Sequence, residues 1–205
     1  MRLAVFSDIH ANLHALQAVW EDLEAQRPQA VYCLGDLVGY GAYPNEVVEF
    51  IRKRAIPTIM GNVDEGVGFD LDDCGCAYRG AEERARGDVS RLWSQAHTSA
   101  ENKAFLQQRP LQIRLEQSRP TLLLVHGSPR KMNEFLWEST TPTHLLEKLC
   151  DDYRADVIVA THTGLPRTRE LSNDRLFVNC GVLRRPANDG TTCAGYTILD
   201  AQDTN

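Results

Sequence analysis

Carboxylate, amide and imidazole side chains follow the ends of five apolar segments in this sequence. The segments end in Asp8-Ile9-His10, Gly35-Asp36, Gly61-Asn62, His126-Gly127 and His162. Because binding sites in open α/β sheets form beyond the carboxyl ends of the strands, we expect these side chains to converge. All of them offer oxygen or imidazole nitrogen atoms and none offers a thiolate. Such a mixed set suits Mn, Fe, Zn and related divalent ions.

The number of donors indicates a pair of ions. The candidate metal ligands are Asp8, His10, Asp36, Asn62, His126 and His162. Six ligands exceed what one four-coordinate ion needs, so two ions that share a carboxylate are the natural interpretation. We expect Mn²⁺, with Fe, Zn, Ni or Co as alternatives, because three histidines make Mg less suitable. Gly35 and Gly61 each precede a ligand, where a missing side chain lets the backbone turn tightly.

Each motif alone also has an ordinary structural explanation. Asp8 and Asp36 could each cap a turn, Asn62 could end its strand, and a histidine at a strand end is often only hydrogen-bonded. The same accident at five strand ends is the less economical explanation, so we favour a metal centre. The other histidines are expected on helices. His14 could approach the site as a substitute acid but is better explained as a surface residue, and His97 and His144 have no expected role in the site.

Apolar and amphipathic segments alternate in the first half of the chain. Strands are predicted at 3–8, 30–36 and 56–62, and helices after an N-cap at Asn12 and at 45–54. This βαβαβ order predicts a mostly parallel sheet with helices on its faces. Residues 65–80 are rich in Gly and Asp and are expected to form a long loop.

The second half is predicted to add three helices and further strands. The helices are expected at about 82–97, about 99–108 and around 144–150, the second with Thr98 and Glu101 at capping-box spacing. Strands are expected at 111–117, 121–127, 156–162, 175–181 and 195–200. Because we find no internal repeat or linker, residues 1–205 are expected to form a single domain.

Composition restricts the partners and the compartment. The net charge of −6 argues against broad nucleic-acid binding and against binding to an anionic membrane surface. No signal-peptide pattern opens the chain and no apolar run is long enough to span a membrane, so we expect a cytoplasmic protein with free thiols. Cys74 and Cys76 are the only close pair, which gives a zinc ribbon little support. Cys33 and Cys180 are expected in the core, and no particular role is assigned to Cys193. The sequence does not indicate the oligomeric state.

The five blocks, in this order, resemble the calcineurin-like metallophosphoesterases, in particular their small bacterial and archaeal phosphodiesterases. The pattern of that superfamily is D-x-H, G-D, G-N-H-[DE], H and G-H-x-H. The matching stretches are DIH at 8–10, GD at 35–36, GNVD at 61–64, VHG at 125–127 and THTG at 161–164. The resemblance covers nearly the whole chain. It implies an α/β fold in which two mixed sheets flanked by helices form a four-layer αββα sandwich.

The resemblance also implies roles for the candidate ligands. Asp8 and His10 would bind the first ion and Asp36 would bridge both ions. The second ion would be held by Asn62, His126 and His162. Asp36 and Asn62, together with Asp64 at the acidic position of the motif, are the residues expected to support catalysis.

Two positions depart from the superfamily pattern. The last His of G-H-x-H, also a first-ion ligand, falls on Gly164. Water or a substrate oxygen must replace it, or the first ion binds weakly. Val63 stands where larger phosphatases carry a His proposed to protonate the leaving group. Its absence favours diesters or good leaving groups, which need less proton donation. Thr161 in place of the first Gly of the motif is a milder departure.

The expected activity is hydrolysis of a small phosphoester, most naturally a phosphodiester, by a hydroxide that bridges two ions. A monoester, nucleotide or phosphoprotein substrate is an open alternative. The segments 65–80 and 129–142 are expected to line the approach to the site, and Arg184 and Arg185 could meet a phosphate. The rival class is a catalytically impaired scaffold or binding protein of the same fold, which Gly164 and Val63 favour. The retained ligand set favours the enzyme, because buried unpaired carboxylates and imidazoles are costly.

Overall fold

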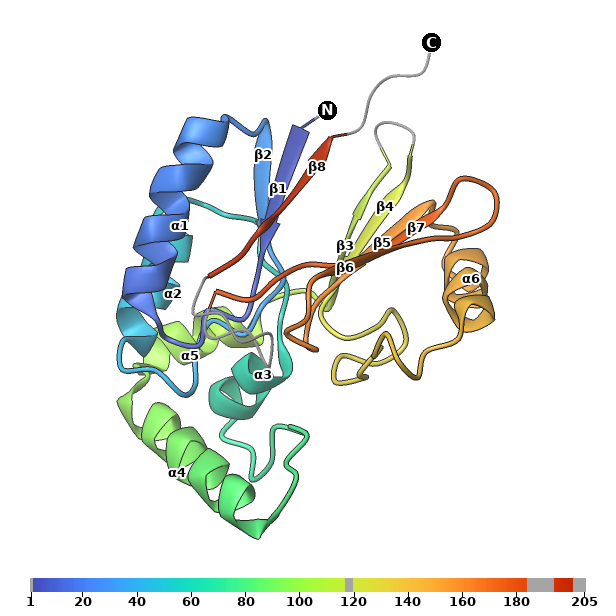
Figure 1. Ribbon diagram of the computed structural model, residues 1–205. Coiled ribbons are helices and arrows are strands. Elements are labelled where there is room, and N and C mark those ends of the chain that lie inside the picture. The colour runs from blue at the N-terminus through green and yellow to red at the C-terminus, as the bar shows by residue number, and fades with distance from the viewer. Residues whose placement is uncertain (1, 117–119, 184–193, 201–205) are drawn as a thin grey trace.

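Two mixed sheets lie face to face in the computed structural model, which describes residues 2–116, 120–183 and 194–200 (Figure 1). Arg184, Arg185 and Cys193 lie outside the described residues. The smaller sheet has the order β2-β1-β8, with strands β1 Arg2–Phe6, β2 Ala30–Cys33 and β8 Thr197–Asp200. The larger sheet has the order β3-β4-β5-β7-β6, with strands β3 Gln112–Leu115, β4 Leu122–Val125, β5 Val157–Ala160, β6 Arg167–Glu170 and β7 Leu176–Asn179.

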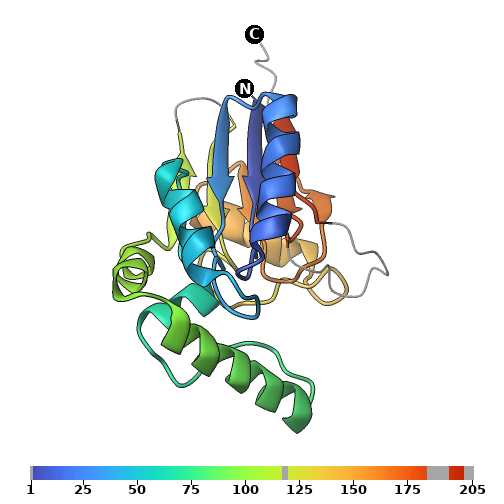
Figure 2. The ribbon, with the colours of Figure 1, turned by 90° about the vertical axis from the view of Figure 1, so that its left-hand side faces the viewer.

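Helices cover the outer faces of both sheets. Helices α1 (Leu13–Gln26) and α2 (Pro44–Lys53) lie against the smaller sheet, and α6 (Thr143–Asp152) lies against the larger one (Figures 1 and 2). From left to right, Figure 1 therefore shows helices, sheet, sheet and helix. This arrangement confirms the expected four-layer αββα sandwich. Three further helices, α3 (Asn62–Gly68), α4 (Ala81–His97) and α5 (Ala100–Gln107), lie at the lower end in this view.

The alternation of side chains along the strands builds the core. In β1, Leu3 and Val5 pack between the two sheets, whereas Ala4 and Phe6 pack beneath α1 and α2. The interior strand β4 has the same two buried faces, which is why its sequence is a continuous run of apolar residues. Full burial of one such aliphatic side chain contributes roughly 1.5–3 kcal/mol. The two sheets are thus fixed against each other by the residues that precede the candidate ligands.

The strand predicted at 56–62 is wrong. The structure forms only an isolated bridge between Cys33 and Thr58, and α3 begins at Asn62. The reason is local, because the Asp64 side chain accepts a hydrogen bond from the backbone N–H of Gly61 and caps this helix. Helix α3 also shortens the loop expected at 65–80. The candidate ligand Asn62 therefore projects from the first turn of a helix, not from the end of a strand.

Two smaller corrections concern a missed strand and a cap. Strand β6, with the sequence RTRE, was not predicted, because an edge strand rich in charge carries no apolar signal. Helix α5 is capped by Ser99, whose side chain accepts from Asn102 N, and not by Thr98. Thr98 instead donates its hydroxyl proton to the carbonyl of Ser94. The predicted cap at Asn12 is confirmed, since its side chain accepts from Ala15 N at 3.2 Å.

Helix α4 projects from the body of the molecule (Figure 2). Only Gly87 and Ser94 of this 17-residue helix are buried. In the described part of the chain, all helices are too short or too polar to cross a membrane. The described cysteines are free thiols, and Cys33 and Cys180 are buried as expected.

Candidate metal centre

The loops that follow β1, β2, β4 and β5 meet at one end of the sandwich. Strands β1 and β2 are parallel, as are β4 and β5, so their carboxyl ends point the same way within each sheet. Backbone hydrogen bonds join the loops, from Asp8 N to Gly35 O at 3.0 Å and from His10 N to Asp36 O at 2.9 Å. Across the larger sheet, Thr161 N donates to His126 O at 2.8 Å. Hydrogen bonds between main chains therefore hold these loops together independently of their side chains.

Two clusters of possible ligand atoms share Asp36. Asp8, His10 and Asp36 form one cluster, and Asp36, His126 and His162 form the other. Within each cluster the ligand atoms lie within 4.8 Å of one another. Asn62 belongs with the second cluster, because its Oδ1 lies 3.0 Å from His126 Nε2. The structure thus brings all six predicted ligands together.

Backbone carbonyls orient two of the imidazoles. His126 donates from Nδ1 to Leu34 O at 2.7 Å, and His10 donates from Nδ1 to Val38 O at 3.1 Å. Because a carbonyl can only accept, each Nδ1 carries the proton and each Nε2 is left as the ligand atom. These Nε2 atoms lie 3.5 Å and 3.7 Å, respectively, from Asp36 Oδ2. Fixing the tautomer in this way is the usual support of a metal-binding histidine.

The amide of Asn62 is oriented by the loop that follows α3. Its Nδ2 donates to the carbonyl of Cys74 at 2.7 Å. The amide oxygen consequently faces His126 and the second cluster. The segment expected to line the approach to the site therefore also positions one of its ligands.

Asp8 is held by two hydroxyl groups that sequence reasoning missed. Ser7 donates to Asp8 Oδ2 at 2.7 Å and Thr161 donates to the same oxygen at 2.6 Å. Both hydroxyls are buried. Thr161 was noted only as a departure from the superfamily motif, yet its hydroxyl links the two sheets at the carboxylate. The signal available in the sequence was its position immediately before His162.

The side chain of Asp64 supports the site through hydrogen bonds to the backbone. It is fully buried, and its two oxygens accept from the backbone N–H groups of Asp36, Leu37, Val38 and Gly61. This binding mode clamps the loop of Asp36 to the start of α3. The tight approach requires glycines, because a Cβ on Gly35 would lie 2.4 Å from Gly61 N. Likewise, a Cβ on Gly61 would lie 2.2 Å from Asp36 Oδ1.

Four of the candidate ligands have left-handed backbone conformations. Their φ angles are +51° for Asp8, +49° for His10, +55° for Asp36 and +70° for His162. Non-glycine residues adopt this region at a cost of about 1–3 kcal/mol each. Such strain persists only where the surrounding structure enforces it, and it concentrates at functional sites. The clustering of these conformations at one end of the sandwich is a second, independent sign of a functional site.

The cluster is strongly coupled electrostatically. Burial tends to raise the pKa of both Asp8 and Asp36, but neighbouring histidines more than offset this and hold each pKa below its usual value. Burial tends to lower the pKa of His126, but the charge of Asp36 raises it to about 9. Burial and the charge of His126 lower the pKa of His162 to about 4. The site therefore holds carboxylates in their ionised form together with one neutral imidazole.

His162 provides the test of whether an ion fits. Its ring stacks on Phe135 at 3.9 Å between centroids, and Phe135 in turn stacks on Trp137. Its Nε2 is buried and has no hydrogen-bond partner. A buried polar nitrogen without a partner costs free energy, and a cation shared with His126 and Asp36 would satisfy it. The donor set therefore fits a divalent ion at this position.

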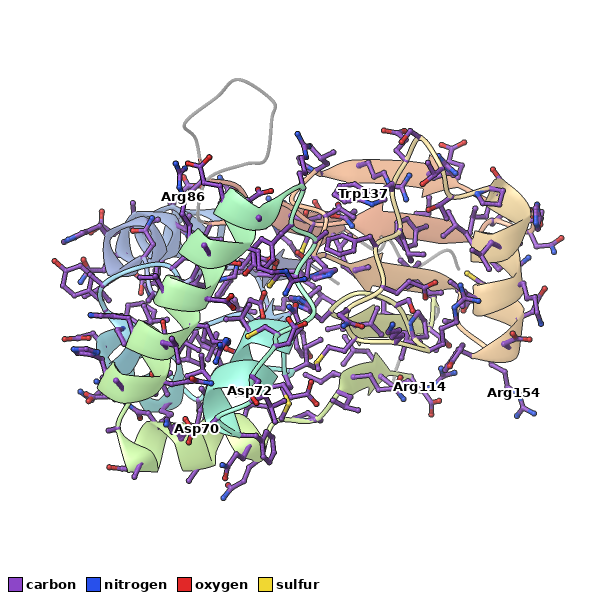
Figure 3. All side chains as sticks on the ribbon, turned by 90° about the horizontal axis from the view of Figure 1, so that it is seen from below. Asp70, Asp72, Arg86, Arg114, Trp137 and Arg154 are labelled. Carbon is purple, nitrogen blue, oxygen red and sulfur yellow. The ribbon has the colours of Figure 1, made fainter. Side chains whose placement is uncertain are left out.

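Other predicted features lie outside the clusters. Gly164, at the vacant ligand position, has a φ of +72° and no donor side chain. His14, His97 and His144 are exposed on helices. Figure 3 views the molecule from the end that carries the site, with Trp137 over the half that contains the larger sheet and Arg86 over the half that contains α1. As expected, the segment 129–142 contributes to this end, through Phe135 against His162.

Comparison with known proteins gives a consistent picture. A family model described as the calcineurin-like phosphoesterase superfamily domain matches residues 1–204. An uncharacterized protein of Methanocaldococcus jannaschii is 32% identical over 218 residues, which cover 98% of this chain and 83% of the relative.

Two solved structures share the fold. A metallophosphoesterase from Sphaerobacter thermophilus has a TM-score of 0.73 and 26% identity, covering 97% of this chain and 83% of that one. A hypothetical protein from Pyrococcus horikoshii has a TM-score of 0.78 at 18% identity, covering 98% of this chain and 88% of that one.

Proposed function

Because the chain belongs to the calcineurin-like phosphoesterase superfamily, we propose that it is a phosphodiesterase that works with two divalent ions. The observation that carries this proposal is the pair of ligand clusters with Asp36 in common. Two ions bound there would lower the pKa of a water molecule and offset the negative charge on the phosphoryl oxygens. Manganese is the ion we propose, on the basis of the mixed carboxylate, amide and imidazole donors.

The residues of the chain have separate tasks in this proposal. Asp8 and His10 would hold the first ion, Asn62, His126 and His162 would hold the second, and Asp36 would contribute to both sites. The two oxygens of Asp64 accept from backbone N–H groups, which leaves them poorly placed to bind an ion or a substrate. We therefore propose that Asp64 positions the loop that carries Asp36.

A diester is the favoured substrate because of Val63. This side chain is buried, and its backbone N–H donates to Asp36 Oδ1 at 2.9 Å. The superfamily motif has an imidazole at this position, and a valine can donate no proton. Diesters with good leaving groups depend least on such a donor.

The test is hydrolysis by metal-stripped protein to which Mn²⁺ is returned. We expect bis(p-nitrophenyl) phosphate to be hydrolysed faster than p-nitrophenyl phosphate, and both activities to disappear when the ion is chelated. Asp36→Asn should be inactive. Asp72→Asn, a change of an exposed carboxylate in the nearby loop, should match the wild type.

The rival function is a binding scaffold, and one observation favours it. Gly164 leaves the first cluster one ligand short of the superfamily motif. If the protein binds less than one ion per chain and hydrolyses neither ester in saturating Mn²⁺, the scaffold replaces the enzyme. Binding of two ions without hydrolysis would exclude a degraded metal site but contradict the proposed activity on these esters.

A further inference from the structure

Tyr40 follows in the chain a residue that packs on Val63, where the imidazole of the superfamily motif is missing. The preceding residue, Gly39, packs directly on Val63, since a Cβ on Gly39 would lie 2.5 Å from Val63 Cγ1. The ring of Tyr40 meets the ring of His10 edge-on, with 4.9 Å between centroids. Tyr40 therefore borders the first ligand cluster through its ring, and its chain neighbour Gly39 packs on Val63.

The backbone of Tyr40 is held in an unfavourable conformation. Its φ is +60°, which is rare for a bulky side chain and is maintained only by its surroundings. One such restraint is a hydrogen bond from Tyr40 N to Ser90 Oγ of α4 at 2.8 Å. The hydrogen bond to Ser90 thus anchors the backbone from which the phenol ring reaches His10.

The hydroxyl of Tyr40 belongs to a chain of contacts that reaches the second cluster. It donates to Cys76 Sγ at 3.4 Å, and Asn62 Nδ2 approaches the same sulfur at 3.6 Å. Tyr40 Oη also lies 3.3 Å from Tyr78 Oη. The ring at His10 and the hydroxyl two contacts from Asn62 place Tyr40 between the residues proposed to hold different ions.

Helix α4 also fixes Tyr78. A Cβ on Gly87 would lie 2.0 Å from Tyr78 Oη, so a glycine is required where this phenol packs. Gly87 and Ser90 lie on the side of α4 that faces the body, and they hold the two tyrosines from the same direction. Helix α4, most of whose residues are exposed, therefore contacts both tyrosines.

We propose that the hydroxyl of Tyr40, paired with that of Tyr78, donates a hydrogen bond to the leaving-group oxygen of the phosphoester. This inference rests on the proposed phosphodiesterase function. A thiol sulfur is a weak hydrogen-bond acceptor, whereas the leaving-group oxygen becomes negatively charged as the P–O bond breaks. The hydroxyl of Tyr40 therefore exchanges its hydrogen bond to Cys76 for one to this oxygen. The oxygen of one water bonds to phosphorus, the two products share its protons, and Tyr40 keeps its own.

A role for Cys76 as a redox sensor is less consistent with the structure. Burial and the nearby charge of Asp36 raise the pKa of the Cys76 thiol, which disfavours the reactive thiolate. Among the described residues, neither ligand cluster includes Cys76. Its contacts with Asn62 and Tyr40 instead suit a residue that keeps both side chains in place.

A leaving-group series tests the proposal. Two diesters that share one methyl group are compared, one with p-nitrophenolate and one with unsubstituted phenolate as leaving group. Tyr40→Phe should lower kcat for the phenyl ester by about 10- to 100-fold, because the poorer leaving group phenolate depends on the donated hydrogen bond. The same variant should lower kcat for the p-nitrophenyl ester by less than about threefold. Tyr78→Phe should show the same selectivity with a smaller loss.

The controls separate this role from a structural one. Tyr43→Phe changes an exposed tyrosine of the same loop and should leave both rates unchanged. Mn²⁺ titration by calorimetry should give the same stoichiometry and affinity for Tyr40→Phe and the wild type. Equal losses on both esters, or weakened Mn²⁺ binding, would overturn the inference while leaving the proposed function intact. A wild type that hydrolyses neither ester would overturn both.

Discussion

The carboxylate of Asp64 accepts a hydrogen bond from the backbone N–H of Asp36 at 2.7 Å. The residue common to the two ligand clusters is therefore held through its main chain by a second, fully buried acid. The same carboxylate accepts from Gly61 N, immediately before Asn62. One side chain thus sets the distance between two of the proposed ligands.

Replacing Asp64 by Asn is expected to damage both the fold and the site. In Asp64→Asn, the side-chain NH₂ group would replace one carboxylate oxygen. The backbone N–H groups that now donate to this oxygen would lose their acceptor. Buried donors without partners cost about 1–3 kcal/mol each, so we expect a loss of about 2–5 kcal/mol in the free energy of unfolding. Urea denaturation of metal-free protein measures this loss. Asp72→Asn is the matched control, and equal stability of the two variants would contradict the positioning role.

Proton competition should govern metal binding. Burial tends to lower the pKa of His126, but the charge of Asp36 raises it from its ordinary value of 6.5 to about 9. An ion needs the neutral imidazole, so its apparent affinity should rise about tenfold per pH unit from pH 7 toward 9. Calorimetry in buffers of different ionisation enthalpy should detect release of about one proton at pH 7. Heats that do not depend on the buffer would contradict this prediction.

The same shift affects the stability of the metal-free protein. Because the pKa of folded His126 is raised, its contribution is complete below about pH 6.5 and is lost as pH rises through about 9. The melting temperature of the metal-free protein should fall over this interval. In saturating Mn²⁺ the proton is already displaced, so the fall should disappear. Parallel pH profiles with and without Mn²⁺ would be inconsistent with an ion at His126.

Restoring the missing ligand should have opposing effects. Gly164→His offers an imidazole to the first cluster, but the φ of +72° imposes a backbone cost of about 1–3 kcal/mol. We expect a lower melting temperature in the absence of metal and activity at lower Mn²⁺ concentration. Gly164→Ala carries the backbone cost without the ligand and is the control. If both variants need the same Mn²⁺ concentration as the wild type, residue 164 does not face the first ion.

The resemblance of the five motif blocks was sufficient to predict the sandwich. The polar residues that follow apolar segments were sufficient to predict that the six candidate ligands converge, although Asn62 lies at the start of a helix. Strand β1 has two buried faces, so RLAVF is recognisable from its composition alone. Edge strand β6 lacks this signal, since two of its four residues are arginines. The segment before Asn62 was misassigned because the cap formed by Asp64 determines where α3 starts.

The supporting residues of the site were less predictable for a physical reason. Thr161 and Ser7 act through hydroxyl groups that meet at Asp8 from different sheets, a contact that no local pattern encodes. Phe135 covers His162 from a segment without regular structure. Most candidate ligands can be recognised because they follow the ends of apolar strands, whereas the residues that support them are brought together only by the folded chain.

Metal stoichiometry across three proteins tests the central claim most directly. Metal-stripped wild type, His162→Ala and Asp36→Asn are each loaded with Mn²⁺, freed of excess ion and analysed for bound metal. Two clusters that share Asp36 predict two ions for the wild type, one for His162→Ala and none for Asp36→Asn. One ion retained by Asp36→Asn, with the protein still folded, would contradict the shared carboxylate.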